Sequence, residues 1–189
     1  MFWRFWSPGD GPEAHLLWDT RIRRPKAEDE ASNYLRQRLN DIIGGRGAMA
    51  NREVQARPVN PTGIPERTDL RIDATASDPR AGGPPVLTIV GEVKAAWNTD
   101  LRTAMRSQLA ERYMLDTGAR WGLYIVLWFD VRWWAADQGT MDRNRVKRLD
   151  RTSVLRDLRQ QAAELGNDGY NIKVVMLDMS YERPEPTGT

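Results

Sequence analysis

The sequence predicts a mixed α/β sandwich in which helices cover both faces of a central sheet. Helical and strand patterns alternate along the chain in the order helix, three strands, helix, strand, helix, strand. Two of the strand segments, VLTIVGEVKA and WGLYIVLWFD, are almost continuously apolar, as expected for strands buried inside a sheet. The 189 residues suffice for one domain with a substantial core. We expect residues 26–180 to form it, between an aromatic lead-in at 1–25 and a disordered tail at 181–189.

The first helix is predicted to begin after Pro25 and to end at Gly44 and Gly45. On a helical wheel its apolar face consists of Ala31, Leu35, Leu39 and Ile42. Glu28 continues this face one turn earlier, whereas Glu30 points away from it. An acid in the first turn of a helix also suits the helix dipole, so Glu28 has a structural as well as a functional interpretation.

Three strands are predicted next, the first at about residues 48–59, before a turn region rich in Pro and Gly. Residues 67–76 alternate strictly, with apolar side chains on one face and Asp69, Arg71 and Asp73 on the other. The loop at 77–85 separates this strand from the apolar strand at 86–95, and consecutive strands joined in this way predict a β-hairpin. The chain then continues as a helix, a central strand, a charged loop, a helix and a last strand, at residues 100–116, 121–130, 137–152, 153–165 and 171–180.

The composition excludes several kinds of site. The chain has no cysteine, which excludes disulfides and thiolate metal sites and fits a reducing cytoplasm. Its single histidine, His15, argues against a zinc site built from imidazoles, so any metal would be a hard cation held by oxygen. No apolar run is long enough to cross a bilayer, and we expect no membrane partner. The balance of 28 basic and 26 acidic residues indicates polyanion binding only weakly.

A charged pair interrupts the apolar strand at 86–95. Glu92 and Lys94 lie two residues apart and therefore share a face, and buried charge is costly unless it is paired or holds a metal. If the hairpin forms, Asp69 joins them at a strand end. Two such carboxylates suit Mg²⁺, and a lysine beside them can orient an attacking water and balance charge on a phosphate. The alternative is an ion pair at the end of a strand.

Asp69 and the triplet Glu92-Val93-Lys94, embedded in VLTIVGEVK, resemble the PD-(D/E)xK nuclease superfamily, and the similarity in element order covers residues 27–130. The resemblance implies a restriction-endonuclease-like αβββαβ core and Mg²⁺-dependent hydrolysis of DNA, with Mn²⁺ able to substitute. It implies that Asp69 and Glu92 bind the metal and that the Val93 carbonyl and Glu28 complete its shell. Lys94 would assist the nucleophilic water.

The helix after the triplet places Gln108 and Arg112 in the middle of its apolar face, which comprises Leu101, Ala104, Met105, Leu109 and Leu115. Polar groups there need partners, unless both side chains reach the helix edge. RecB-like nucleases have a Gln at a similar position, usually with a Tyr four residues later. Here Tyr113 comes five residues later and falls on the flank of the wheel. We therefore expect Gln108 to orient the phosphate or a ligand, and Arg112 to contact nucleic acid.

Three questions stay open at the level of sequence. Asp73 shares a face with Asp69 and is the alternative metal acid, although its position later in the strand favours Asp69. Four basic residues of the charged loop either grip a DNA backbone or serve solubility: Arg143, Arg145, Lys147 and Arg148. The alternative to a nuclease is a catalytically silent nucleic-acid-binding or protein-docking module, and a homodimer or a larger defence or repair complex fits either function.

Overall fold

The computed structural model describes residues 14–51, 54–55, 67–75, 86–137 and 140–180. The expected disordered tail at 181–189, residues 1–13 of the aromatic lead-in and the whole loop at 77–85 lie outside these ranges.

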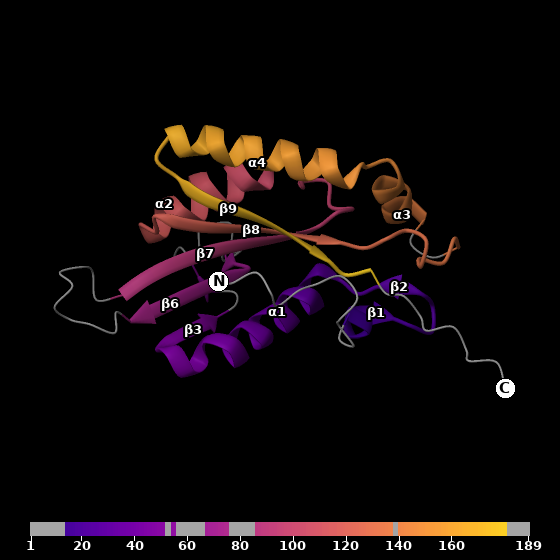
Figure 1. Ribbon diagram of the computed structural model, residues 1–189, viewed down its shortest axis with the longest axis horizontal. Helices are drawn as coiled ribbons and strands as arrows, with labels where there is room; N and C mark the ends of the chain where they lie inside the picture. The colour runs from indigo at the N-terminus through magenta and orange to yellow at the C-terminus, as the bar shows by residue number, and fades with distance from the viewer. Residues whose placement is uncertain (1–13, 52–53, 56–66, 76–85, 138–139, 181–189) are drawn as a thin grey trace, which may run out of the picture.

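A five-stranded mixed sheet forms the centre of the molecule, in the order β3-β6-β7-β8-β9 (Figure 1). Its strands are β3 (Ala48–Asn51), β6 (Leu70–Thr75), β7 (Val86–Ala95), β8 (Trp121–Trp128) and β9 (Asn171–Asp178). The first three pair antiparallel, which confirms the hairpin expected between β6 and β7. β8 and β9 continue the sheet in parallel, as expected for strands joined through helices.

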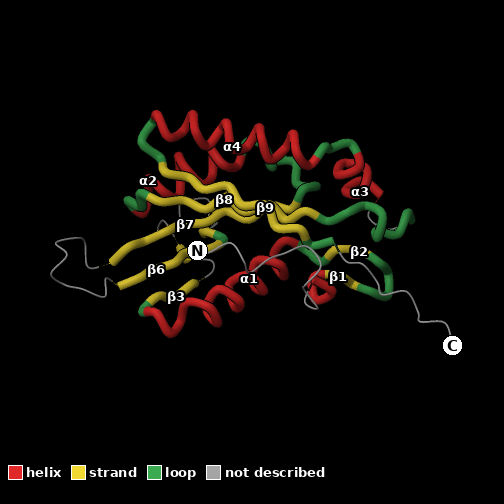
Figure 2. Tube along the Cα trace, viewed as in Figure 1, coloured by secondary structure: helices red, strands yellow, loops and turns green. Residues whose placement is uncertain are grey.

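Helices cover both faces of this sheet, as predicted (Figure 2). Helix α1 (Glu28–Ile43) packs on one face. The other face carries the π-helix η4 (Met105–Met114), the short α2 (Leu115–Thr117) and α4 (Arg151–Asn167). Among the described residues, none of the helices combines the length and apolar character that a bilayer-spanning segment requires.

The small elements lie at the edges of this sandwich. Strands β1 (Trp18–Asp19) and β2 (Arg24–Pro25) form a separate two-stranded ladder next to the start of α1. A second two-stranded ladder joins β4 (Val54–Gln55) to β5 (Arg67–Thr68). The 3₁₀ turns η1 (Ala14–Leu17) and η2 (Gly44–Arg46) precede β1 and follow α1.

The charged loop expected at 137–152 is wrong in part, because residues 140–147 form helix α3 (Thr140–Lys147). The helix buries Val146, while Asp142 lies in its first turn and Arg145 and Lys147 in its last turn. This charge order suits the helix dipole. Its two apolar residues, Met141 and Val146, are five apart and do not share a face of an α-helix, so the segment gives almost no periodic signal and the pattern suggested a loop.

The helix that follows β7 is a π-helix, and this corrects part of its predicted buried face, of which Leu101, Ala104, Met105 and Leu109 are buried as expected. Hydrogen bonds from i to i+5 bring residues five apart onto one face. The buried residues of η4 are Met105, Leu109, Ala110, Tyr113 and Met114. Leu115, expected on the buried face, is 63% exposed. The π register buries Ala110, Tyr113 and Met114 and leaves Gln108 and Arg112 half-exposed, so no guanidinium has to be desolvated.

Candidate active site

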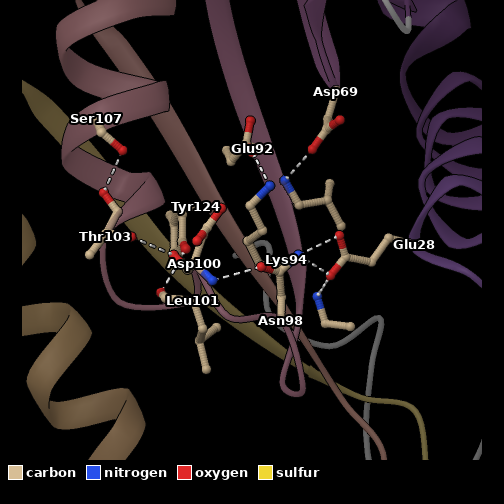
Figure 3. Close-up of polar contacts among 12 residues, drawn as sticks. Glu28, Asp69, Glu92, Lys94, Asn98, Asp100, Leu101, Thr103, Ser107 and Tyr124 are labelled. Atoms are coloured by element: carbon tan, nitrogen blue, oxygen red, sulfur yellow. Dashed lines mark hydrogen bonds and ion pairs between the residues drawn. The ribbon is translucent and has the colours of Figure 1, made fainter. Parts of the chain in front are cut away.

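The register of β6 on β7 brings Asp69 to the charged triplet. Leu70 lies opposite Gly91, and one further step along both strands places Asp69 beside Glu92. The ladder ends at this point, and Asp69 turns its side chain toward β7, where Oδ2 accepts a hydrogen bond from the Val93 N–H at 3.0 Å (Figure 3). The carboxylate is thereby held in place by the backbone of the triplet itself.

Gly91 allows the two strands to approach closely immediately before the triplet. A Cβ at this position would lie 3.1 Å from the Leu70 Cβ and 3.4 Å from its Cδ2. Any side chain at 91 would therefore push β6 outward. The glycine thus helps to set the separation between Asp69 and Glu92.

Glu92 is the most deeply buried charged group at the site, with 1% of the residue exposed. Its Oε1 forms an ion pair with the Lys94 Nζ at 2.5 Å, which shows that the two side chains share a face as predicted. Its Oε2 is buried without a hydrogen-bond partner in the part of the chain that the structure describes. Burial, reinforced by Asp69, raises the pKa of Glu92 to about 8, although Lys94 opposes this shift. The buried carboxyl of Glu92 therefore keeps its proton to a much higher pH than an exposed carboxyl does.

Lys94 remains protonated at neutral pH. Burial favours the neutral amine, but Glu92, Asp69 and Glu28 outweigh it, so the pKa of Lys94 is raised. A cationic ammonium cannot serve as a general base. It can donate hydrogen bonds to a water or stabilise negative charge on a phosphate.

Glu28, the first residue of α1, is bonded to the end of β7. Its Oε1 accepts hydrogen bonds from the Ala95 N–H at 2.7 Å and from the Asn98 Nδ2 at 2.8 Å, and its Oε2 accepts from the same Nδ2 at 2.9 Å. Burial is the main reason why the pKa of Glu28 is raised. Glu30 instead pairs with Lys26 at 3.6 Å on the surface, which confirms that Glu28 has the phase that faces the site.

The hydrogen bonds of Glu28 favour a role in positioning α1 against β7. Its role as a metal ligand stays a prediction, because both of its carboxylate oxygens already accept hydrogen bonds. Figure 3 shows Glu28 and Asn98 on one side of Lys94 and Glu92 on the other.

Asp73, the alternative metal-binding acid, is bonded to side chains away from the charged triplet. It accepts hydrogen bonds from the Arg71 Nε at 2.9 Å and from the Thr88 Oγ1 at 2.6 Å. Burial opposes its ionisation, but these two hydrogen bonds prevail and lower the pKa of Asp73. The structure therefore places Asp69 beside the triplet and holds Asp73 further along β6.

Tyr113 is the residue at this site that the helical wheel missed. It is 7% exposed, and burial together with the charges of Glu92 and Asp69 raises its pKa, which places its hydroxyl near both carboxylates. Arg112 hydrogen-bonds to that hydroxyl. In the π register Tyr113 and Gln108, five residues apart, share a face. The signal in the sequence is the spacing of the apolar residues, since Met105 and Ala110, and Leu109 and Met114, are also five apart.

The four basic residues expected to contact DNA differ in their surroundings. Arg143 Nε donates to the Trp134 carbonyl at 3.1 Å, and Arg145 pairs with Asp142 at 3.1 Å. Lys147 and Arg148 are exposed. Their role in DNA binding stays a prediction, and the exposed pair is better placed for it than the engaged pair.

The oxygen atoms available at the site indicate whether a divalent cation could bind there. No group of three or more histidine or carboxylate side chains suited to a metal occurs within the described residues. Asp69 and Glu92 provide two carboxylates, and Oε2 of Glu92 has no other partner there. The N–H and C=O of a strand residue point to the same side, so the Val93 carbonyl faces the edge that Asp69 occupies. Two carboxylates and a carbonyl, with water in the other positions, fit Mg²⁺.

No protein-family model, curated protein or solved structure matches this chain. The resemblance to PD-(D/E)xK nucleases therefore rests on the residues of the chain and their arrangement.

Proposed function

We propose that this protein is a Mg²⁺-dependent deoxyribonuclease built on a restriction-endonuclease-like αβββαβ core. One observation carries the proposal. Asp69, Glu92 and Lys94 cluster where the β6–β7 ladder ends, and the buried Oε2 of Glu92 has no hydrogen-bond partner among the described residues. An ion pair that served only stability would satisfy both oxygens of so deeply buried a carboxylate, since an unpaired buried acceptor is costly.

In this proposal Asp69 and Glu92 hold the cation, together with the Val93 carbonyl. When bound, Mg²⁺ supplies Lewis acidity toward a phosphate oxygen and lowers the pKa of a bound water. Lys94 keeps its proton and holds the attacking water or the phosphate by donating hydrogen bonds. Gln108, half-exposed on η4, orients the phosphate from the side of the helix.

The test is cleavage of supercoiled plasmid and of linear DNA with Mg²⁺, with Mn²⁺ and with EDTA. We expect cleavage with either metal and none with EDTA. Lys94→Ala and Asp69→Ala should each lower the rate by about 10²-fold or more, the size of effect that loss of one electrostatic contact to a reacting group produces. Asp73→Asn, on the same strand, is the matched control and should retain cleavage.

Two outcomes would remove the proposal. One is unchanged cleavage by Lys94→Ala, because the activity would then come from elsewhere. The other is retention of DNA without hydrolysis under any divalent metal, which would favour the silent binding module instead.

A further inference from the structure

A groove of about 740 Å³ opens next to the candidate active site. Its walls come from the β1–β2 hairpin, the start of α1, the turn after β7, the segment after β8 and the start of α3. Figure 1 shows these elements gathered at one end of the molecule. A volume of this size suits a small ligand or a single nucleotide.

Glu28 and Asn98 belong to both the groove and the site. They line the groove, and they are hydrogen-bonded to each other at 2.8 Å. Glu28 also accepts from the N–H of Ala95, the residue that follows Lys94. A group bound in the groove therefore lies one hydrogen-bonded pair away from the triplet.

Two tryptophans line the groove and make part of its wall aromatic. The ring of Trp97 packs against Phe129 and Trp134 with centroids 5.2 Å apart in each case, and it remains half-exposed. Trp134 is 2% exposed, and its indole nitrogen has no hydrogen-bond partner among the described residues. Buried tryptophans usually find an acceptor for this N–H. The wall thus offers an aromatic surface, formed by the half-exposed ring of Trp97 and backed by the buried Trp134.

The charges of the groove favour a ligand that donates hydrogen bonds. Five carboxylates line it, those of Asp19, Glu28, Asp29, Glu30 and Asp142, against two basic side chains, those of Arg24 and Lys26. The pairs Arg24–Asp142 and Lys26–Glu30 are both 3.6 Å long, well beyond the ~2.7–2.9 Å of a strong charge-assisted hydrogen bond. Asp142 Oδ1 also accepts from Arg145 at 3.1 Å, but a carboxylate has about four acceptor positions, so Asp142 and Glu30 keep capacity to accept from a ligand. The excess of carboxylates would repel a phosphate inside the groove.

We propose that this groove binds an unstacked nucleobase of the substrate strand next to the cleaved bond, with a preference for guanine; this rests on the proposed nuclease function. The base stacks on Trp97, as bases stack on aromatic side chains in other single-strand sites. Guanine places its N1–H and N2–H₂ donors side by side, which matches the two oxygens of a carboxylate, whereas adenine and cytosine present one amino group each. Arg24 and Lys26 remain available for the flanking phosphates.

The first experiment measures binding of the four deoxynucleosides by calorimetry, without metal. Nucleosides carry no phosphate, so they report on the groove and not on the hydrolytic centre. We expect deoxyguanosine to bind most tightly, and Trp97→Ala to weaken it by about tenfold or more. Asp142→Asn should remove most of the preference for guanine. Trp121→Ala is the matched control, because Trp121 is 51% exposed at the start of β8 and does not line the groove.

Trp97→Phe provides a variant that keeps an aromatic ring against Phe129 and Trp134. It should fold and bind deoxyguanosine with intermediate affinity, even if Trp97→Ala does not fold. Asp142→Asn removes a charge from a partly exposed position, so it tests base preference without opening the core.

The second experiment compares oligonucleotides that carry guanine, another base or an abasic site beside the cleaved bond. We expect kcat/KM to fall about tenfold or more for the abasic substrate with the wild type, and by a clearly smaller factor with Trp97→Phe combined with Asp142→Asn. Binding of deoxyguanosine through Trp97 without any DNA cleavage would overturn the nuclease function and keep the groove as a base site. Cleavage that is indifferent to the neighbouring base, or equal affinity for all four nucleosides, would overturn the base site alone.

Discussion

At the scale of single residues, Glu92 connects the geometry of the site to its pH dependence. Burial and Asp69 raise its pKa from 4.5 to about 8 in the folded protein. At pH values between 4.5 and about 8, Glu92 therefore keeps a proton in the folded protein that it has lost in the unfolded chain. The contribution of Glu92 to the free energy of unfolding must therefore decrease as pH rises through this window, because this group binds fewer protons in the unfolded state there.

Glu92→Gln should abolish this decrease, since a glutamine does not titrate. Urea denaturation of the wild type and of Glu92→Gln, at several pH values between about 5 and 8, measures the free energy of unfolding of each protein. We expect the free energy of unfolding of the wild type to decrease relative to the variant as pH rises. Parallel curves would mean that Glu92 ionises normally despite its burial.

Metal binding should release a proton from the same carboxylate. At neutral pH Glu92 is largely protonated in the absence of metal, and a cation must displace that proton to reach its oxygen. Calorimetric titration with Mg²⁺ in two buffers of different ionisation enthalpy measures the release. We expect a proton release from the wild type that Glu92→Gln lacks, and equal heats in both buffers would contradict it.

At the scale of elements, packing against β8 holds η4 where it is. A Cβ on Gly122 would lie 2.8 Å from the Met114 Sδ and 3.3 Å from Leu109 and Ile172. Gly122→Ala should therefore force the buried side chains of Met114 and Leu109 to shift, which we expect to destabilise the fold by about 1–3 kcal/mol and to lower cleavage. Gly166→Ala is the matched control, because a Cβ there meets nothing within 4 Å. Equal stability of the two variants in urea would show that η4 is not held by this contact.

The elements also show where sequence reasoning succeeded. The period-two pattern of 67–76 and the apolar run at 86–95 correctly predicted the hairpin, and the helical phase of Glu28 correctly placed it next to β7. In both cases regular backbone geometry determines which face a side chain occupies. Asp69 could be placed at the strand start, but its hydrogen bond to the Val93 N–H depends on where the ladder ends.

Tyr113 and α3 could not be predicted in the same way. The wheel assumed an α-helix, and the two apolar pairs spaced five apart are too few to choose between the α and π periods. In α3, Val146 alone faces the core among charged neighbours. In both places tertiary contacts outweigh the local periodicity.

At the scale of the whole molecule, a bound cation should stabilise the entire domain, because the ligands proposed for it, Asp69 and Glu92, come from two segments that the central sheet brings together. A ligand that binds only the folded state adds about 2.7 kcal/mol at a hundredfold excess over its Kd. We expect Mg²⁺ to raise the melting temperature of the wild type reversibly, and EDTA to cancel the increase. Asp69→Asn should lose the effect and Asp73→Asn should retain it, whereas an equal shift in both variants would place the cation elsewhere.

The hydrogen bonds of Glu28 reach far along the chain. Ala95 and Asn98, which donate them, follow Glu28 by 67 and by 70 residues. Because a ribosome synthesises a chain from its N-terminus, α1 is made well before Ala95 and Asn98. The donors that bind the Glu28 carboxylate are therefore absent at that stage. No nascent fragment that stops short of residue 98 can complete this contact. The order of synthesis therefore keeps the candidate active site incomplete until residue 98 has been translated.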